Sequence, residues 1–220
     1  QEEKGVVDKY IGDCIMAFWN APLEVPDHRA RACLAAIDCQ DRIKDLNVDL
    51  DKDLPEVPAI RIGLNSGFAT VGLTGSEKKL QYTVIGDEVN LASRLEGANK
   101  FFGSDIMASD ATYQGAKDVV EARELGRVRV VGKAIPIRVY ELLARKGRLS
   151  EAWKQALPLW EKGVAHFNKK EFGPALEAFQ GVEKLIPEDG PSAVYLTICG
   201  DYAVIPPPDE WDGVFNLTAK

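Results

Sequence analysis

The sequence has few of the residues on which several common site chemistries depend. It contains two histidines, His28 and His166, which lie far apart in the chain. A Ser-His-Asp triad or a histidine-based metal site is therefore poorly supported. The four cysteines show no CxxC spacing, so we expect reduced, partly buried thiols rather than a zinc knuckle or a disulfide.

Long apolar runs and an excess of positive charge are also missing. No run approaches the ~20 residues of a membrane-spanning helix, and the first residues do not resemble a signal peptide. The formal net charge of −7 argues against broad nucleic-acid binding, although a local phosphate site is compatible with it. We therefore expect a soluble, cytoplasmic protein with no nucleic-acid partner.

What is present is an ordinary globular composition, with 45% hydrophobic and 28% charged residues among 220. Segments of strand and helix periodicity alternate along the chain up to about residue 142, which predicts an α+β sandwich with one sheet. Two of the strands surround a Gly-Asp pair that is typical of a tight hairpin turn. The expected strands span 7–11, 14–18, 60–64, 69–73, 82–84, 106–108, 127–131 and 137–142. One expected helix spans 27–46, and a second begins at Asp87 as its N-cap and reaches residue 98. A short third helix is expected between residues 108 and 127, and residues 49–57 are expected to be a loop.

The composition changes near residue 146, which divides the chain into two expected parts, 1–145 and 146–220. The second part begins with two predicted antiparallel helices at 151–167 and 171–186. Their spacings match one tetratricopeptide-like repeat. The residues at these spacings are Gly163, Ala175, Phe179 and Pro187.

A single repeat cannot bury its own apolar face, so we expect this helical hairpin to pack on the first part or on a partner. The Pro-rich tail that follows, Pro206 to Pro208, is expected to be extended. Trp211 and Phe215 are expected to anchor this tail to a surface.

Two segments carry candidate chemistry, DKYIGDCIMAFW at 8–19 and YTVIGDEVNLASRLEGANK at 82–100. In the second, Asn90 and Arg94 lie four residues apart on an expected helix, so both face one side near its start. An amide beside a guanidinium near a helix N-terminus is suited to phosphate or ribose oxygens. Taken alone, the pair is more typical of a solvated helix face.

The first segment places Asp13 at the tip of the expected hairpin and Lys9 on the strand before it. A Gly-Asp turn usually has no further role, and such a lysine usually lies along the protein surface. Neither residue indicates a site on its own.

Together, the two segments resemble both halves of the signature of class III adenylate/guanylate cyclase catalytic domains, with that family's spacing between them. The resemblance extends from about Val6 to Leu143, and VGKAIPIRVYELL at its end is similar to the family's final hairpin. It implies a ferredoxin-like cyclase sandwich and an adenylate cyclase that converts ATP to cyclic AMP and pyrophosphate. It also implies a head-to-tail homodimer with two shared active sites.

The resemblance assigns a metal-binding role to one residue and catalytic roles to two others. Asp13 corresponds to one of two aspartates that hold two divalent ions, Mg²⁺ or Mn²⁺. Asn90 would orient the ribose, and Arg94 would stabilise charge on the α-phosphate during in-line attack of the 3′-hydroxyl. In the family's geometry, Asp13 serves the site opposite to that of Asn90 and Arg94 of the same chain.

The resemblance also assigns substrate contacts. Lys9 and Thr83 match a base-recognition pair that favours adenine over guanine. Many relatives have a triphosphate-binding lysine where this sequence has Val131, and Lys133 would substitute for it.

The match has one large departure, because the family's first metal aspartate, its strand and the next two helices have no counterpart here. We therefore expect a cyclase domain incomplete at its N-terminus, with low or no activity. We also expect a sheet that rearranges or recruits a strand from a partner. The parent protein would have room for an upstream regulatory or membrane domain.

Three interpretations stay open. The first is an adenylate cyclase, and the second is a catalytically inactive cyclase-fold module for binding or dimerisation. The third and weakest is a protein-interaction domain built on the C-terminal helices. A diguanylate cyclase is disfavoured because its GGDEF-type loop is missing.

Overall fold

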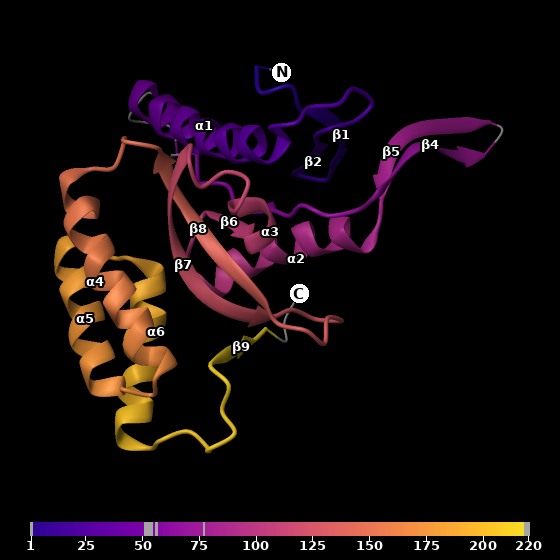
Figure 1. Ribbon diagram of the computed structural model, residues 1–220. Helices are drawn as coiled ribbons and strands as arrows, with labels where there is room; N and C mark the ends of the chain where they lie inside the picture. Colours follow the sequence, from indigo (N-terminus) through magenta and orange to yellow (C-terminus); the bar gives the residue numbers. More distant parts are fainter. Residues whose placement is uncertain (1, 51–54, 56, 77, 218–220) are drawn as a thin grey trace.

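The computed structural model describes residues 2–50, 55, 57–76 and 78–217. Figure 1 shows a curved central sheet with helices packed around it and a long hairpin that projects from the body. Most of the loop expected at 49–57 lies outside the described residues. Among the described helices, none has both the length and the apolar content needed to cross a bilayer.

The central sheet has five strands. In spatial order they are β3 (Ile62–Leu64), β6 (Ile106–Ser109), β8 (Ile137–Arg145), β7 (Val120–Arg129) and β9 (Val214–Asn216). β3 and β6 run parallel, β6, β8 and β7 run antiparallel, and β9 pairs with β7 in parallel. Every residue of β6 is buried, as expected for a strand covered on both faces.

Two hairpins lie outside this sheet. β1 (Val6–Ile11) pairs with β2 (Cys14–Phe18), and β4 (Thr70–Ser76) pairs with β5 (Lys79–Ile85). Gly12 has a φ of 63° in the first turn, as the Gly-Asp pair predicts. The expectation of one sheet is wrong, because neither hairpin pairs with the five-stranded sheet within the residues that the structure describes.

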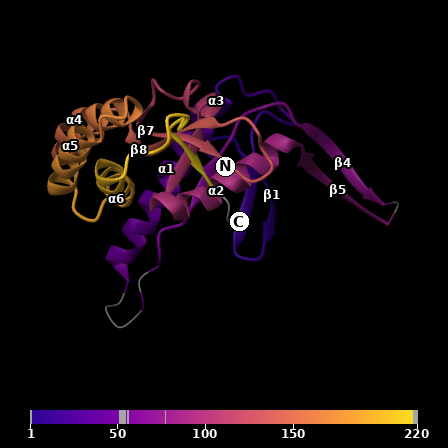
Figure 2. The same ribbon diagram turned by 90° about the horizontal axis from the view of Figure 1, so that it is seen from below.

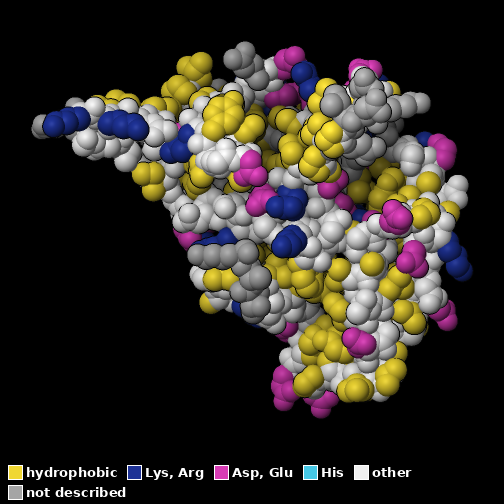
Figure 3. Space-filling model, turned by 180° about the vertical axis from the view of Figure 1, so that it is seen from behind, with side chains coloured by type: hydrophobic (Ala, Val, Ile, Leu, Met, Phe, Trp, Pro, Cys, Tyr) yellow, Lys and Arg dark blue, Asp and Glu magenta, His cyan; other side chains and the backbone are white. Residues whose placement is uncertain are grey.

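The β4–β5 hairpin extends from the body as an arm (Figures 1 and 2). Figure 3 shows Lys and Arg side chains toward its tip. Leu73, Leu80 and Ile85 on the arm are each more than half exposed. Such a concentration of exposed apolar side chains is typical of a protein–protein contact surface.

Different helices cover the two faces of the central sheet. α1 (His28–Asp49) packs on one face and α2 (Asp87–Phe102) on the other. β6 supplies both cores because its side chains alternate: Ile106 and Ala108 lie in the core under α1, and Met107 lies in the core under α2.

The predicted bounds of the two long helices α1 and α2 agree with the structure to within a few residues. The N-cap of α2 and the start of strand β7 differ from the prediction. Gly86 occupies the N-cap position of α2, so Asp87 is its first helical residue rather than its cap. β7 begins at Val120 rather than Arg127, because two register irregularities break the alternation on which the prediction relied. The short helix expected before β7 is α3 (Asp110–Tyr113).

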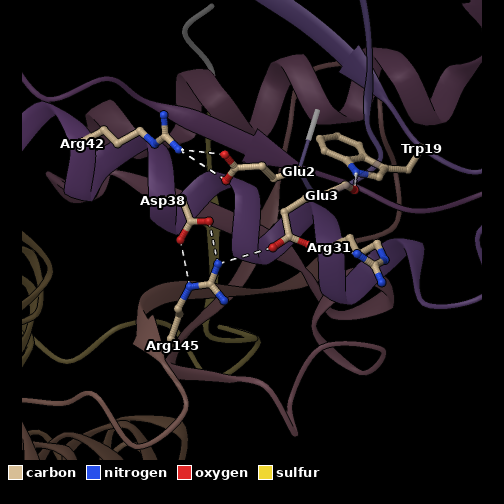
Figure 4. Close-up of polar contacts among 7 residues, drawn as sticks. All are labelled: Glu2, Glu3, Trp19, Arg31, Asp38, Arg42 and Arg145. Carbon is tan, nitrogen blue, oxygen red and sulfur yellow. Dashed lines mark hydrogen bonds and ion pairs between the residues drawn. The ribbon is translucent and has the colours of Figure 1, made fainter.

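Ion pairs attach the start of the chain to α1 (Figure 4). Glu3 lies 3.3 Å from Arg31 and 3.4 Å from Arg145, and Arg145 also makes two contacts with Asp38, at 2.8 and 2.6 Å. The indole of Trp19 donates to the backbone oxygen of Glu3 at 2.8 Å. The β1–β2 hairpin is therefore held against α1 at its base, although ion pairs that keep contact with solvent contribute only about 0–1 kcal/mol each.

The C-terminal region contains three helices. α4 (Glu151–Asn168) and α5 (Phe172–Leu185) lie at the two predicted segments. α6 (Gly190–Val204) was not predicted, because its apolar residues are spread around the helix instead of forming a stripe. Each helix adds a buried aromatic ring to the core that also contains α2. These rings belong to Trp160, Phe179 and Tyr195. The tetratricopeptide-like character and the boundary at residue 145 stay predictions.

The tail after α6 returns to the sheet. Trp211 packs edge-on against Phe167 with a centroid distance of 5.2 Å, and the ring of Phe215 lies nearly parallel to that of Phe167 at 6.0 Å. β9 then pairs with residues 127–129 of β7. Both aromatic residues anchor the tail as predicted, and the additional strand was not foreseen.

A buried arginine joins β7 to the C-terminal helices. Arg123 Nε donates to Glu141 at 2.6 Å, and its two Nη atoms donate to the carboxylate of Asp189 at 2.7 and 2.5 Å. The guanidinium lies over the rings of Trp153 and Trp160, 4.7 and 4.3 Å from their centroids. Burial opposes the charge on Arg123, but the two carboxylates raise its pKa above the ordinary value. The group is therefore a fully paired charge in an aromatic environment.

We predict that Arg123→Met lowers the free energy of unfolding by about 3–5 kcal/mol, because it leaves Glu141 and Asp189 as buried carboxylates without a counter-charge. Urea denaturation followed by circular dichroism measures the change. Arg138→Met on the neighbouring strand is the matched control. Arg138 pairs with Glu124 at 3.3 Å while half exposed, so its loss should cost less than about 1 kcal/mol. Equal effects of the two substitutions would contradict the role of the buried pairs.

Candidate functional site

The β5–α2 connection carries three of the predicted site residues. Thr83 lies near the end of β5 and is buried, and the chain then turns at Gly86 into α2. Asn90 is exposed in the first turn of α2, and Arg94 follows one turn later, half-buried. The i, i+4 spacing puts Asn90 and Arg94 on one face of the helix, as predicted.

Arg94 has an unusual environment. In the described part of the chain, its Nη1 atom is buried and has no hydrogen-bond partner. The β7–β8 turn lies against the same guanidinium, since a Cβ atom added at Gly132 would be 3.2 Å from Arg94 Nη2. A guanidinium has five donors and no acceptor, and an unpaired buried donor costs about 1–3 kcal/mol or more. The orphaned donor is thus available to an acceptor oxygen from outside the described residues.

Lys133 lies on the same turn, next to Gly132. Its ammonium pairs with the carboxylate of Asp87 and lies 3.5 Å from Glu88 Oε1. The hydrogen bond from Lys133 lowers the pKa of Asp87 and keeps that carboxylate charged. The structure thus brings Lys133 to the first turn of α2, where its ammonium is paired with the carboxylates of Asp87 and Glu88. Val131, at the position where a lysine was expected from the family pattern, is 39% exposed.

Lys9 and Thr83 come together from different hairpins. Lys9 Nζ donates to Thr83 Oγ1 at 3.0 Å, a contact that joins residues 74 positions apart in the sequence. Thr83 Oγ1 in turn donates to Asp8 Oδ2 at 2.6 Å. The predicted base-recognition pair is therefore preformed, with a third residue attached to it.

Asp8 is the residue that the sequence analysis missed. In a regular strand, successive side chains point to opposite faces, so Asp8 and Lys9 would not be expected at one site. The β1–β2 register shifts between Val7 and Lys9, which leaves Asp8 as an extra residue in a β-bulge. The bulge allows both side chains to reach Thr83. The one sequence signal for this role of Asp8 is that an acidic residue directly precedes Lys9.

Asp13 stands apart from these groups. It is exposed at the tip of the first hairpin, and within the described residues its hydrogen-bond partner is the thiol of Cys14 at 3.7 Å. Mg²⁺ and similar ions need several oxygen ligands, whereas no described group of three or more His, Cys, Asp or Glu residues is placed to hold a metal. The described residues of one chain therefore do not fit a divalent-metal site.

The sequence matches the family model of the adenylate and guanylate cyclase catalytic domain over residues 3–144. Adenylate cyclase 1 of Rhizobium meliloti is 38% identical over 140 residues, which cover 63% of this chain and 21% of that relative. The chain thus spans about a fifth of the length of this curated relative.

Solved structures of both cyclase types resemble this protein. The adenylyl cyclase CyaB from P. aeruginosa has a TM-score of 0.60 and 32% identity, over 68% of this chain and 76% of that one. The guanylate cyclase domain of RhGC from Catenaria anguillulae, in complex with GTP, has a TM-score of 0.53 and 31% identity, over 66% and 75%. The mixed α+β fold with its curled sheet is that of class III cyclases, and the chain belongs to the family of adenylate and guanylate cyclase catalytic domains.

Proposed function

We propose that this domain converts ATP to cyclic AMP and pyrophosphate. The observation that carries the proposal is the buried, unpaired Nη1 of Arg94, one helix turn from Asn90 on the element that follows Thr83. A donor that lacks a partner in the free protein gains one when a phosphate oxygen binds. The cyclase relatives support the reaction class.

In this proposal each side chain has one task. Lys9 and Thr83 bind the purine, Asn90 orients the ribose, and Arg94 binds the α-phosphate. Lys133 approaches the triphosphate and would exchange its carboxylate partners for phosphate oxygens. The similar solved structures include adenylate and guanylate cyclases, so the preference for ATP rests on the Lys9–Thr83 pair.

The reaction is an in-line displacement at phosphorus. The ribose 3′-oxygen forms a bond to the α-phosphorus, the bond from that phosphorus to the β-bridging oxygen breaks, and pyrophosphate leaves while the hydroxyl proton passes to solvent. Arg94 stabilises the charge that develops on the α-phosphate oxygens. The two-metal part of the mechanism stays a prediction from the family resemblance, since the described residues do not form a metal site.

We further propose that two copies of the chain pair and share their active sites. The exposed apolar side chains of the β4–β5 arm support an intermolecular contact. The separation of Asp13 from the Arg94 cluster supports a role for Asp13 in the site of the other copy.

We predict that Arg94→Ala lowers kcat by about 10³-fold, because it removes the group that meets charge in the transition state. Cyclic AMP formation from ATP with Mn²⁺ in the buffer measures turnover, and displacement of a fluorescent ATP analogue measures binding. Lys100→Ala, at the exposed end of the same helix, is the matched control and should behave as the wild type. Wild-type binding without turnover would support the inactive module, and an undiminished Arg94→Ala rate would refute the assigned role.

Shared sites predict complementation between two inactive variants. Asp13→Ala and Arg94→Ala chains, each inactive alone, should regain activity when mixed. Random pairing makes half of the dimers mixed, and each mixed dimer has one intact site of two, so roughly a quarter of the wild-type activity should return. Mixing two preparations of the same variant is the control. If mixed dimers form, as a differently tagged pair would reveal, and activity stays absent, the shared-site proposal fails.

A further inference from the structure

The Asp8 carboxylate belongs to the Lys9–Thr83 pair but has no exposure to solvent. Its side chain is 0% exposed, whereas the side chain of Lys9 is 31% exposed. Asp8 lies 2.6 Å from Thr83 Oγ1, 3.5 Å from Lys9 Nζ and 3.5 Å from Gln81 Nε2. A fully buried carboxylate is retained only where donors surround it. Here the donors are the two base-recognition residues and one neighbour.

The chemistry of the three groups fixes the direction of the Thr83 hydroxyl. An ammonium has donors and no acceptor, and a carboxylate has acceptors and no proton to give. Thr83 must therefore accept from Lys9 and donate its single proton to Asp8. One lone pair of Thr83 and one N–H of Lys9 remain free. The pair thus offers a ligand one acceptor, on Thr83, and one donor, on Lys9.

This polarity matches one purine edge and opposes the other. Adenine has an amino group at position 6 and an unprotonated N1, so Thr83 can accept from the amino group while Lys9 donates to N1. A 6-oxopurine in the same position presents an oxygen to the Thr83 lone pair and an N1–H to Lys9. An acceptor then faces an acceptor at Thr83 and a donor faces a donor at Lys9, so binding of the 6-oxopurine is disfavoured.

We propose that Asp8 is a positioning residue that makes the site selective for a 6-aminopurine, by holding the Thr83 hydroxyl so that it can only accept. This inference rests on the proposed function and adds the cause of its nucleotide preference. Without Asp8, Thr83 is free to rotate and to donate to the oxygen of a 6-oxopurine. The β-bulge at Asp8 is the backbone feature that makes the arrangement available.

The test measures the affinities of ATP and ITP for the wild type and for Asp8→Ala, by displacement of a fluorescent ATP analogue. ITP presents the 6-oxo group and N1–H without the 2-amino group of GTP, so it isolates this edge. The ATP-to-ITP affinity ratio should fall by about fivefold or more, as expected for the loss of one mispaired contact. A purely structural defect would weaken both nucleotides together and leave the ratio unchanged.

Two further variants identify Thr83 as the intermediary. Thr83→Ser keeps the hydroxyl and should keep the ratio, whereas Thr83→Val should lower it. Asp8→Ala should then have no further effect in the Thr83→Val background. Independent, additive effects in the double variant would overturn the inference.

Asp8→Val replaces the alanine variant if the latter fails to fold. Its side chain fills more of the Asp8 site but, like alanine, has no oxygen to accept the Thr83 proton, so the same fall in the ratio is expected. An unchanged ratio in a folded Asp8 variant overturns the inference while ATP binding by the wild type leaves the proposed function intact. Wild-type protein that binds neither nucleotide overturns both.

Discussion

The buried ion pairs of Arg123 are the constraint that fixes the C-terminal helices against the central sheet. This residue belongs to β7, Glu141 to β8 and Asp189 to the start of α6, so one guanidinium joins the centre of the sheet to the C-terminal helices. The turn that joins the end of β7 to the start of β8 contains Gly132, which lies against Arg94. The C-terminal helices and the candidate phosphate-binding group thus both contact the β7–β8 hairpin, the former through Arg123 and the latter at Gly132.

The candidate site gains most of its order from a short stretch of chain. β5 delivers Thr83, and α2 follows at once with Asn90 and Arg94, so their relative positions are set by local backbone geometry. Lys9, the partner of Thr83, and Lys133, which pairs with Asp87 in the first turn of α2, come from distant hairpins. Solved structures of both adenylate and guanylate cyclases resemble this fold, so the fold alone does not set the choice of nucleotide.

Features with a local cause could be predicted from the sequence, and features with a tertiary cause could not. The turn at Gly12 and the placement of Asn90 and Arg94 on one helix face follow from dihedral preference and helical spacing. α6 escaped prediction because it is apolar on most sides, and β9 because three residues carry no periodicity. Asp8 escaped because a bulge reverses the direction that alternation assigns to it.

The parallel pairing of β9 with β7 has a consequence for the order in which the protein folds. Arg129 and Asn216, which meet across this pairing, are 87 residues apart in the sequence. Contacts of such long range form late, because closing the intervening loop is entropically costly. During synthesis, the outer edge of β7 stays uncovered until residues 214–216 have emerged, and in that interval it is open to pairing with another nascent chain.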